Sequence, residues 1–289
     1  MLGRLGLRSS AAKPNLIFSG LMSASAAALS THRAIVAKSF GDPSVLELAD
    51  VPTPTPGAGQ VLVKVFASGI NPSDTYVRLG PAGPWGATPH LLPALPYTPH
   101  KDGAGIVQAV GEGVLGAKPG DRVYTTGSLS GTCAQFALCN KADVYPLPPR
   151  ITFAQGACVG VPCATAHRAL SIRCRARPGD AVFIHGASGA VGLAAVQLAV
   201  AMGCTVVGSA GTDGGAAAVR DAGAAAVVDH HAEGYLAQAG AALPEAKGGK
   251  FDIVRRRGWL STSARLADEC GHSSGRCWRW PRTPTSWRT

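Results

Sequence analysis

Three evenly spaced glycines, Gly186, Gly189 and Gly192, form the stretch of this sequence best suited to bind a phosphate group. Between a strand and a helix, the first glycine would let the chain turn sharply. The second would let main-chain N–H groups approach an anion without a Cβ in the way, and the third would let the helix pack close to the strand. Because the spacing is G-x-x-G-x-x-G rather than G-x-G-x-x-G, its flanking elements must support the interpretation.

The flanking sequence supplies those elements. A short apolar run, Ala181–Ile184, precedes the glycines, and a helix-forming stretch follows from Leu193 to Met202. Further strand-like runs at 205–207, 225–228 and 251–254 alternate with helical segments. This βαβαβ pattern predicts a parallel sheet with right-handed crossovers, and it places the pyrophosphate of a dinucleotide at the start of the first helix.

The sequence before the glycines predicts a β-rich domain over residues 32–150, joined by a bridge, 151–178, with a helix near Ala164–Ser171. The proline-rich segment Gly80–Pro99 is predicted to be a loop, because proline excludes regular structure. Turn signals separate strand-like runs at Ala34–Ala37, Val61–Ala67, Ala104–Val110 and Arg122–Tyr124.

The net charge of +10 does not indicate a nucleic-acid-binding protein, because the excess lies at the two ends of the chain. Residues 32–254 contain 16 Lys and Arg against 15 Asp and Glu. Apolar residues make up 46% of the chain, which is typical of a globular protein. No apolar run approaches the ~20 residues that a membrane-spanning helix needs.

The eight cysteines predict a reduced compartment rather than a disulfide framework. None forms a C-x-x-C pair, and their spacings match no zinc finger or ribbon. Several lie in apolar surroundings, where a free cysteine acts as a small hydrophobic residue.

The two ends of the chain differ in character from the middle. Residues 1–31 are rich in Ala, Ser and Arg and contain no acidic residue, which is typical of a transit peptide to the mitochondrion or plastid. The alternative is a disordered extension of a cytoplasmic protein. Residues 255–289 begin with three arginines and contain four of the five tryptophans, without a sustained helix or strand period. We therefore interpret 255–289 as an aberrant, disordered tail that does not supply the rest of a doubly wound sheet.

Several co-linear blocks between Arg33 and Val254 together resemble the zeta-crystallin-type NADPH:quinone oxidoreductases, a zinc-free branch of the medium-chain dehydrogenases/reductases. The blocks are Arg33-Ala34-Ile35, Phe40-Gly41-Asp42-Pro43, Gly69-Ile70-Asn71-Pro72-Ser73-Asp74-Thr75-Tyr76, Leu95-Pro96-Tyr97-Thr98-Pro99, Lys118-Pro119-Gly120-Asp121-Arg122-Val123, Tyr145-Pro146-Leu147-Pro148 and His185-Gly186-Ala187-Ser188-Gly189. The resemblance implies an α/β protein with a β-rich GroES-like substrate domain, 32–150, followed by a Rossmann domain with a parallel sheet, 151–254, here incomplete.

The resemblance places Asn71 and Tyr76 in the substrate pocket, where an amide and a phenol could donate hydrogen bonds to a carbonyl oxygen. Each has an alternative, since Asn71-Pro72 also suits a turn and Tyr76 could pack in the core. Thr165 matches a position near the cofactor, although its hydroxyl could instead cap a helix.

The positions that hold zinc in the zinc-dependent relatives correspond here to Asn71 and to Lys101-Asp102. A neutral amide and an ammonium group are not zinc ligands, so we expect no metal. His100, next to these positions, is interpreted as a loop residue.

The end of the second Rossmann strand favours NADPH over NADH. An acidic residue there would bind the ribose 2′-hydroxyl and repel a 2′-phosphate, but the sequence has Ser209, Gly211 and Thr212. Tyr235 matches a tyrosine that contacts the phosphate in relatives. The residues expected to bind NADPH are Thr165, Gly186, Ala187, Ser188, Gly189, Ala190, Val191, Gly192, Ser209, Gly211, Thr212 and Tyr235.

The function implied by the resemblance is hydride transfer from NADPH to a quinone or another conjugated carbonyl compound, without a metal. In this family the chain after the fourth Rossmann strand completes the nicotinamide side of the site and the dimer edge, and nothing recognisable follows Val254. A reading-frame change or an alternative exon would explain the tail, and a genuinely divergent tail is the other explanation. The alternative function is therefore a non-catalytic truncated product with weak nucleotide binding, in which the family's homodimer is doubtful.

Overall fold

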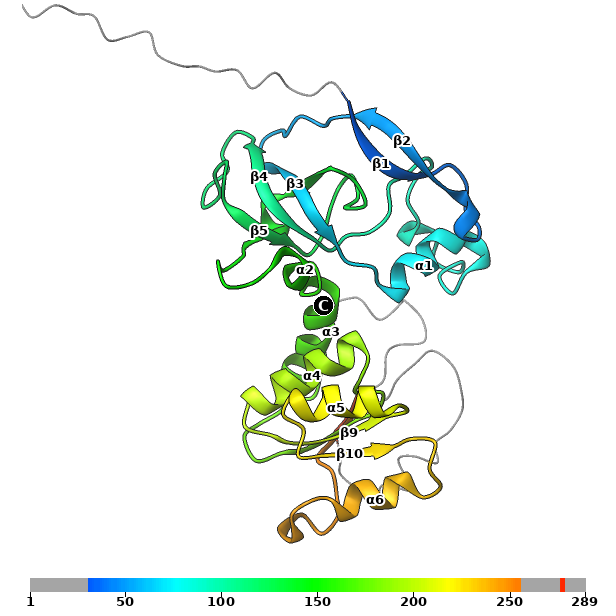
Figure 1. The fold of residues 1–289 in the computed structure, drawn as a ribbon, viewed down its shortest axis with the longest axis vertical. Coiled ribbons are helices and arrows are strands. Elements are labelled where there is room, and N and C mark those ends of the chain that lie inside the picture. The colour runs from blue at the N-terminus through cyan, green and yellow to red at the C-terminus, as the bar shows by residue number, and fades with distance from the viewer. Residues whose placement is uncertain (1–30, 256–275, 279–289) are drawn as a thin grey trace, which may run out of the picture.

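The computed structural model describes residues 31–255 and 276–278, and it confirms the predicted fold class, a β-rich part followed by a parallel sheet with helices (Figure 1). The predicted transit peptide, apart from Thr31, lies outside the described residues, as does most of the segment predicted to be a tail. Among the helices of the described part, none combines the length and the apolar character that crossing a bilayer requires.

The first part is built on an antiparallel sheet whose strands follow the order β6-β3-β4-β5-β7. Its inward side chains, among them Val61, Val63, Val107 and Val123, alternate along the strands and form one buried cluster. The strands are β3 (Gln60–Ser68), β4 (Gly103–Val110), β5 (Arg122–Thr125), β6 (Phe136–Asn140) and β7 (Val144–Pro146). A separate antiparallel pair is formed by β1 (Thr31–Ala37) and β2 (Leu46–Pro52).

The helix α1 (Pro72–Leu79) and the long loop after it lie beside the β1–β2 pair (Figure 1). Pro72 occupies the first turn of α1, where a missing N–H has no consequence for the hydrogen-bond ladder. The loop 80–102 contains 3₁₀ turns at Gly80–Ala82 and Pro89–Leu91 and a single bridge from Tyr97 to Ala37, but no helix or strand, as expected from its prolines.

Two helices, α2 (Phe153–Gly156) and α3 (Gly160–His167), lie between the two parts of the molecule in Figure 1. Thr152 caps α2, because its hydroxyl accepts the N–H of Gln155 at 3.2 Å. A π-helical segment, Arg168–Arg173, continues α3, so the predicted helix near 164–171 is present but begins earlier. The helix α3 packs against α4 (Ala190–Ala201) of the second part.

The second part is a parallel sheet with the order β10-β9-β8-β11-β12. Its central strand, β8 (Ala181–Ile184), is buried on both faces, because Val182 and Ile184 pack on the α4 side while Ala181 and Phe183 pack on the α6 side. The other elements are β9 (Thr205–Ala210), α5 (Asp213–Asp221), β10 (Ala226–Asp229), α6 (Tyr235–Ala241) and a 3₁₀ turn at Glu245–Lys247.

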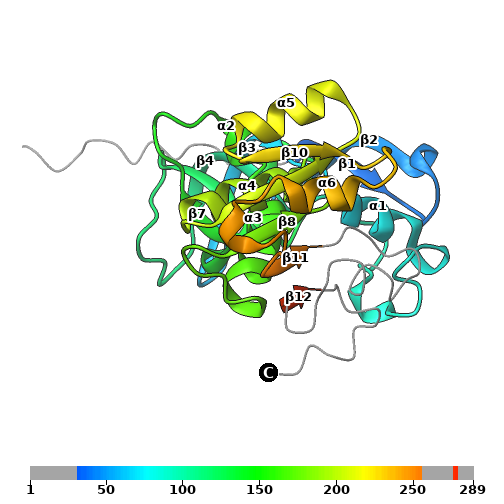
Figure 2. The same ribbon diagram turned by 90° about the horizontal axis from the view of Figure 1, so that it is seen from below.

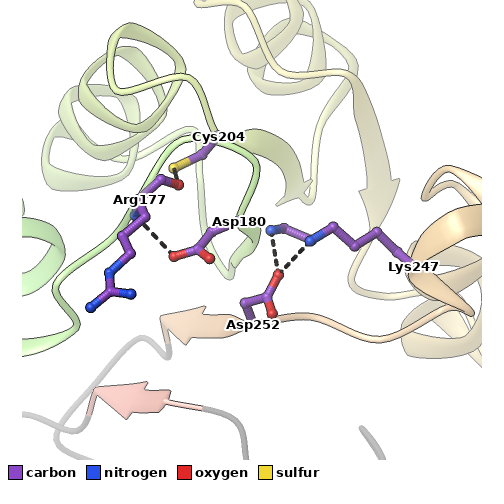
Figure 3. A network of polar contacts seen from close by, with 6 residues as sticks. Arg177, Asp180, Cys204, Lys247 and Asp252 are labelled. Carbon is purple, nitrogen blue, oxygen red and sulfur yellow. Dashed lines mark hydrogen bonds and ion pairs between the residues drawn. The ribbon is translucent and has the colours of Figure 1, made fainter.

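A polar network fixes the start of β8 against the segment that leads into β11 (Ile253–Arg255), as Figure 3 shows. The carboxylate of Asp252 accepts the Ala181 N–H at 2.8 Å and the Lys247 ammonium at 2.8 Å. Asp180 accepts the N–H of Arg177 at 2.9 Å and closes the turn before β8. These polar contacts lie at the start of β8, whereas the glycine turn follows the opposite end of the same strand.

The structure corrects one expectation about the end of the sheet. The predicted strand 251–254 is β11, which spans Ile253–Arg255 and so includes the first arginine. A further strand, β12 (Arg276–Trp278), pairs in parallel with β11, and Figure 2 shows the two side by side. The expectation that residues 255–289 form a disordered tail is therefore wrong at 276–278, which add one strand to the sheet. The pairing needs only main-chain groups, which a search for apolar periodicity does not detect.

Candidate functional site

The glycine turn connects β8 to α4, as predicted, and each glycine has a distinct environment. Gly186 has φ +64°, which a Cβ would disfavour. A Cβ on Gly192 would lie 2.5 Å from the carbonyl oxygen of Gly186, so α4 can approach the turn only with glycine there. A Cβ on Gly189 would meet only that same oxygen, at 3.6 Å, and Gly189 is exposed. Gly189 therefore leaves space for a ligand, whereas Gly186 and Gly192 shape the backbone.

The first turn of α4 presents main-chain donors to that space. Among the described residues, the N–H groups of Ala190, Val191 and Gly192 have no hydrogen-bond acceptor, as is usual for the first turn of a helix. Free N–H groups and the positive end of the helix dipole together favour an anion. The geometry therefore suits one phosphate of a dinucleotide, with Gly189 next to it. Ala187 is buried and Ser188 half-buried in the same turn.

Ser209, predicted to contact the cofactor, is fully buried beneath the turn. Its hydroxyl accepts the Gly186 N–H at 3.0 Å, and its carbonyl oxygen accepts the Ala187 N–H at 2.8 Å. Thr212 is the N-cap of α5, where its hydroxyl accepts the Gly215 N–H at 3.1 Å. Both hydroxyls therefore stabilise the local backbone, and Gly211, between them, is half-buried at the end of β9.

Three histidines surround this strand end, and the sequence interpretation did not single them out. A Cβ on Gly211 would lie 2.5 Å from Nε2 of His231 and 2.8 Å from Nε2 of His230. The ring centroids of His185 and His230 are 5.4 Å apart, and the Tyr235 ring lies edge-on to His185 at 6.0 Å. The signal available in the sequence was the pair His230-His231 directly after the strand that borders β9.

The two residues predicted for the substrate pocket, Asn71 and Tyr76, lie at the start of α1 and within it. Asn71 is the N-cap residue and is 6% exposed, and its own N–H donates to the Asp74 carboxylate at 2.7 Å. Tyr76 is half-buried, with its ring edge-on to Trp85 at a centroid distance of 6.0 Å. Asn71 therefore begins α1, as expected for a turn residue, and its side chain also has a buried polar partner.

That partner is Asp102, a residue with no exposed surface. Its Oδ2 accepts the Asn71 amide at 2.9 Å and the main-chain N–H of Val161, in the first turn of α3, at 2.8 Å. Its Oδ1 has no hydrogen-bond partner among the described residues. Burial raises the pKa of Asp102, against the two N–H groups that lower it. Asp102 thus links the start of α1 to α3, the helix that packs on α4.

Thr165 lies inside α3, four residues after Val161. An interior position excludes the alternative that Thr165 caps the start of this helix. Thr165 is half-buried. Its helix, α3, is hydrogen-bonded to Asp102 through Val161 and packs against α4, so Thr165 lies on the element that connects Asn71 and Asp102 to the glycine turn.

A cavity of about 700 Å³ is lined by α1, the β1–β2 pair, the proline-rich loop and the segment 128–131. Its lining includes Asp74 and Val77 of α1, and Tyr97, His100 and Lys101 of the loop. His100 is in a loop, as predicted, but it also lines this cavity. Within the described residues, no group of three or more His, Cys, Asp or Glu side chains is arranged to hold a metal ion.

Comparison with known proteins adds three kinds of similarity. Residues 57–229 match the family model described as the alcohol dehydrogenase GroES-like domain. Quinone oxidoreductases from Rattus norvegicus and Homo sapiens are 47% and 44% identical over 205 residues, which cover 71% of this chain and 60% of each relative. A solved mycobacterial protein complexed with NADPH aligns with a TM-score of 0.65 and 32% identity, over 78% of this chain and 65% of that one. The chain thus spans about three fifths of the curated relatives.

Proposed function

The chain belongs to the alcohol dehydrogenase GroES-like domain family, and on this basis we propose that it reduces a quinone or a similar conjugated carbonyl compound with NADPH. The observation that carries the proposal is the link between two binding surfaces. The free N–H groups at the start of α4 suit a dinucleotide phosphate, and Asp102 connects Asn71 to α3, which packs on α4. The similarity to the quinone oxidoreductases supports the acceptor class.

NADPH, when bound, supplies the two electrons of the reduction as a hydride. The chain's own residues hold it by the N–H groups of the glycine turn, while His230 and His231 lie beside Gly211, where the proposal places the 2′-phosphate. Asn71 and Tyr76 donate hydrogen bonds to the acceptor oxygen as negative charge develops there.

We further propose that the reaction needs no metal. The support is the donor set, because position 71 carries an amide and position 101 an ammonium group, and neither is a ligand that zinc takes in proteins. Turnover that is unchanged after dialysis against a strong chelator is the expected result, and a loss restored by zinc would contradict it.

The test of the main proposal is the absorbance of reduced nicotinamide when the full chain is mixed with NADPH and tetramethyl-1,4-benzoquinone. This quinone has no free ring position, so the free cysteines cannot add to its ring. NADPH oxidation well above the rate without protein is expected, with NADH slower. No oxidation over background would overturn the proposal.

The alternative is that the chain binds the nucleotide without turnover, and the observation that favours it is the 60% coverage of the relatives. In that case NADPH would raise the thermal transition, because a ligand that binds only the folded state stabilises it, while the quinone would stay oxidised. The two outcomes separate the proposals with the same protein and the same reagents.

A further inference from the structure

His100 has a backbone conformation that is uncommon for a residue other than glycine. Its φ is +71°, in the left-handed region, and among the non-glycine residues that the structure describes only Arg175 shares a positive φ. Strained conformations of this kind persist where the surroundings hold them, and they are concentrated at functional sites. The contacts that hold His100 in this conformation therefore bear on what its side chain does.

Hydrogen-bond counting fixes the tautomer of His100. The Thr132 hydroxyl donates its only proton to the carbonyl oxygen of Asp102 at 2.9 Å. The Ser68 hydroxyl, 2.9 Å from that of Thr132, must then donate to Thr132. Since Ser68 has no second proton, it can only accept from Nδ1 of His100, at 3.1 Å. Nδ1 therefore carries a proton, and Nε2 is the nitrogen that gains or loses one.

Nε2 has no hydrogen-bond partner among the described residues, and the ring lines the 700 Å³ cavity. Much of the cavity wall is apolar, with Leu92, Pro93, Pro96 and Leu129 among its residues. Such a wall suits a planar, weakly polar ring better than a charged metabolite.

The charged and titratable groups that line the cavity with His100 come from three elements. Asp74 belongs to α1, His32 to β1, and Tyr97 and Lys101 to the same loop as His100, while the segment 128–131 contributes none. Burial lowers the pKa of His100, and the charge of Asp74 opposes that shift by favouring the imidazolium. Asp74 also accepts the Asn71 N–H, so the carboxylate whose charge acts on the imidazole is hydrogen-bonded to the predicted pocket residue.

We propose that His100 is the acid that protonates the reduced acceptor, an inference that rests on the proposed function. Addition of a hydride to a quinone leaves a hydroquinone monoanion, with the negative charge on oxygen. The Nε2–H of the imidazolium transfers its proton to that oxygen, so that an O–H bond forms as the N–H bond breaks. The imidazole remains neutral with its Nδ1 proton in place, and water in the cavity returns the proton to Nε2. One quinone thus consumes one hydride and one proton and yields the hydroquinone and NADP⁺.

The test compares His100→Asn with a matched control, His90→Gln. Asparagine tolerates a positive φ, and its amide N–H can still donate to Ser68, but it has no group at the position of Nε2. His90 lies in the same loop, is exposed and does not line the cavity. General acid catalysis contributes about 10²–10⁴-fold, so at pH 6 we expect His100→Asn to lower kcat/KM on the order of 100-fold and His90→Gln to leave it unchanged.

The pH profile and an NMR measurement complete the design. The kcat/KM of the wild type with tetramethyl-1,4-benzoquinone should fall as the pH rises through the pKa of His100, and the fall should vanish in His100→Asn. In the ¹⁵N spectrum of the protein without NADPH or quinone, the His100 signals should show a protonated Nδ1 throughout and a titrating Nε2. Asp74→Asn should move that titration to lower pH.

The outcomes separate the two proposals. An unprotonated Nδ1 in neutral His100, or a wild-type pH profile in His100→Asn, overturns the role of His100 while the reductase proposal stands. Absence of turnover in both the wild type and His90→Gln overturns the reductase proposal, and the acid role with it. If His100→Asn folds poorly, His100→Gly, which removes the backbone strain, replaces it, and added imidazole should restore part of its rate.

Discussion

The amide of Asn71 donates to Oδ2 of Asp102 across 2.9 Å, inside a region where Asp102 has no exposed surface. The same oxygen accepts the N–H of Val161 at 2.8 Å. A predicted pocket residue and the first turn of the connecting helix are therefore oriented by one buried carboxylate. Removing that carboxylate leaves one buried and one half-buried donor without this acceptor, which is more damaging than removing both partners together.

We predict that Asp102→Ala destabilises the fold by about 1–3 kcal/mol, the range for leaving buried polar groups unsatisfied. Asp102→Asn should cost less, because its amide oxygen can accept both N–H groups in place of Oδ2. Urea unfolding of the three proteins measures the difference. Equal stability of Asp102→Ala and the wild type would show that the two hydrogen bonds contribute nothing to the fold.

The pH dependence of stability offers a second check. Burial raises the pKa of Asp102 in the folded protein above its unfolded value, so the folded state binds more protons between the two values. Stability should therefore fall as the pH rises from the ordinary aspartate range through the raised pKa. Burial raises the pKa of Asp74 as well, so Asp102→Asn should reduce this slope rather than remove it. Urea midpoints at several pH values would reveal an unchanged slope if the prediction is wrong.

Two alanine substitutions in the glycine turn should have opposite consequences. Gly192→Ala places a Cβ 2.5 Å from the Gly186 oxygen, so we expect a lower melting temperature. Gly189→Ala meets no atom closer than 3.6 Å, so we expect a stability change of about 1 kcal/mol or less, the scale of an N-cap exchange.

The NADPH affinity of Gly189→Ala should nevertheless fall by about tenfold or more, equivalent to at least ~1.4 kcal/mol, because the methyl group enters the proposed phosphate site. Calorimetric titration gives the affinity and thermal unfolding gives the stability. Normal NADPH binding by Gly189→Ala would place the phosphate elsewhere.

Nucleotide preference should respond to position 231. His231 is exposed and its Nε2 lies close to Gly211, at the strand end where the proposal places the 2′-phosphate. A carboxylate there would repel a phosphate and could bind a ribose 2′-hydroxyl, so His231→Glu should weaken NADPH and strengthen NADH. His231→Gln, the neutral control, should weaken NADPH with little change for NADH. The ratio of the NADPH and NADH dissociation constants, measured for the wild type and both variants, tests this prediction.

The cysteines should differ sharply in reactivity. Burial raises the pKa of Cys139 to about 12, which leaves almost no thiolate at neutral pH, whereas Cys158 is exposed. In the native protein, iodoacetamide should modify Cys158 and spare Cys139, and both should react after unfolding. Mass spectrometry of the peptides identifies the sites, and early labelling of Cys139 would mean that β6 opens readily.

The sequence predicted the parallel-sheet half better than the β-rich half. The run Ala181–Ile184 matches β8 residue for residue, because a strand buried on both faces is apolar throughout. In contrast, β2, β6 and β7 were not predicted. Every residue of β2 is half-exposed or exposed, and the strand contains Glu47 and Asp50, so it lacks a buried apolar face that would reveal it. Its pairing with β1 depends on main-chain groups that composition does not report.

The candidate site shows a similar division. The glycines of the turn were predictable from local requirements, because Gly186 and Gly192 shape the backbone and Gly189 leaves space for a ligand. Asp102 was noted only as part of a pair, Lys101-Asp102, that corresponds to zinc positions in relatives, and His100 only as the neighbour of that pair. Their partners, Asn71, Val161 and Ser68, lie 31, 59 and 32 residues away, and no local pattern encodes such contacts.

The carbonyl oxygen of Asp102 that ends the hydrogen-bond chain from His100 is a main-chain atom, and the same oxygen accepts the Gly69 N–H at 2.9 Å. No codon change at position 102 removes it. A substitution at position 102 can therefore change the hydrogen bonds from the Asp102 side chain to Asn71 and α3 while the His100 imidazole keeps the same tautomer. The two properties of this residue are open to selection separately, although they share one position in the gene.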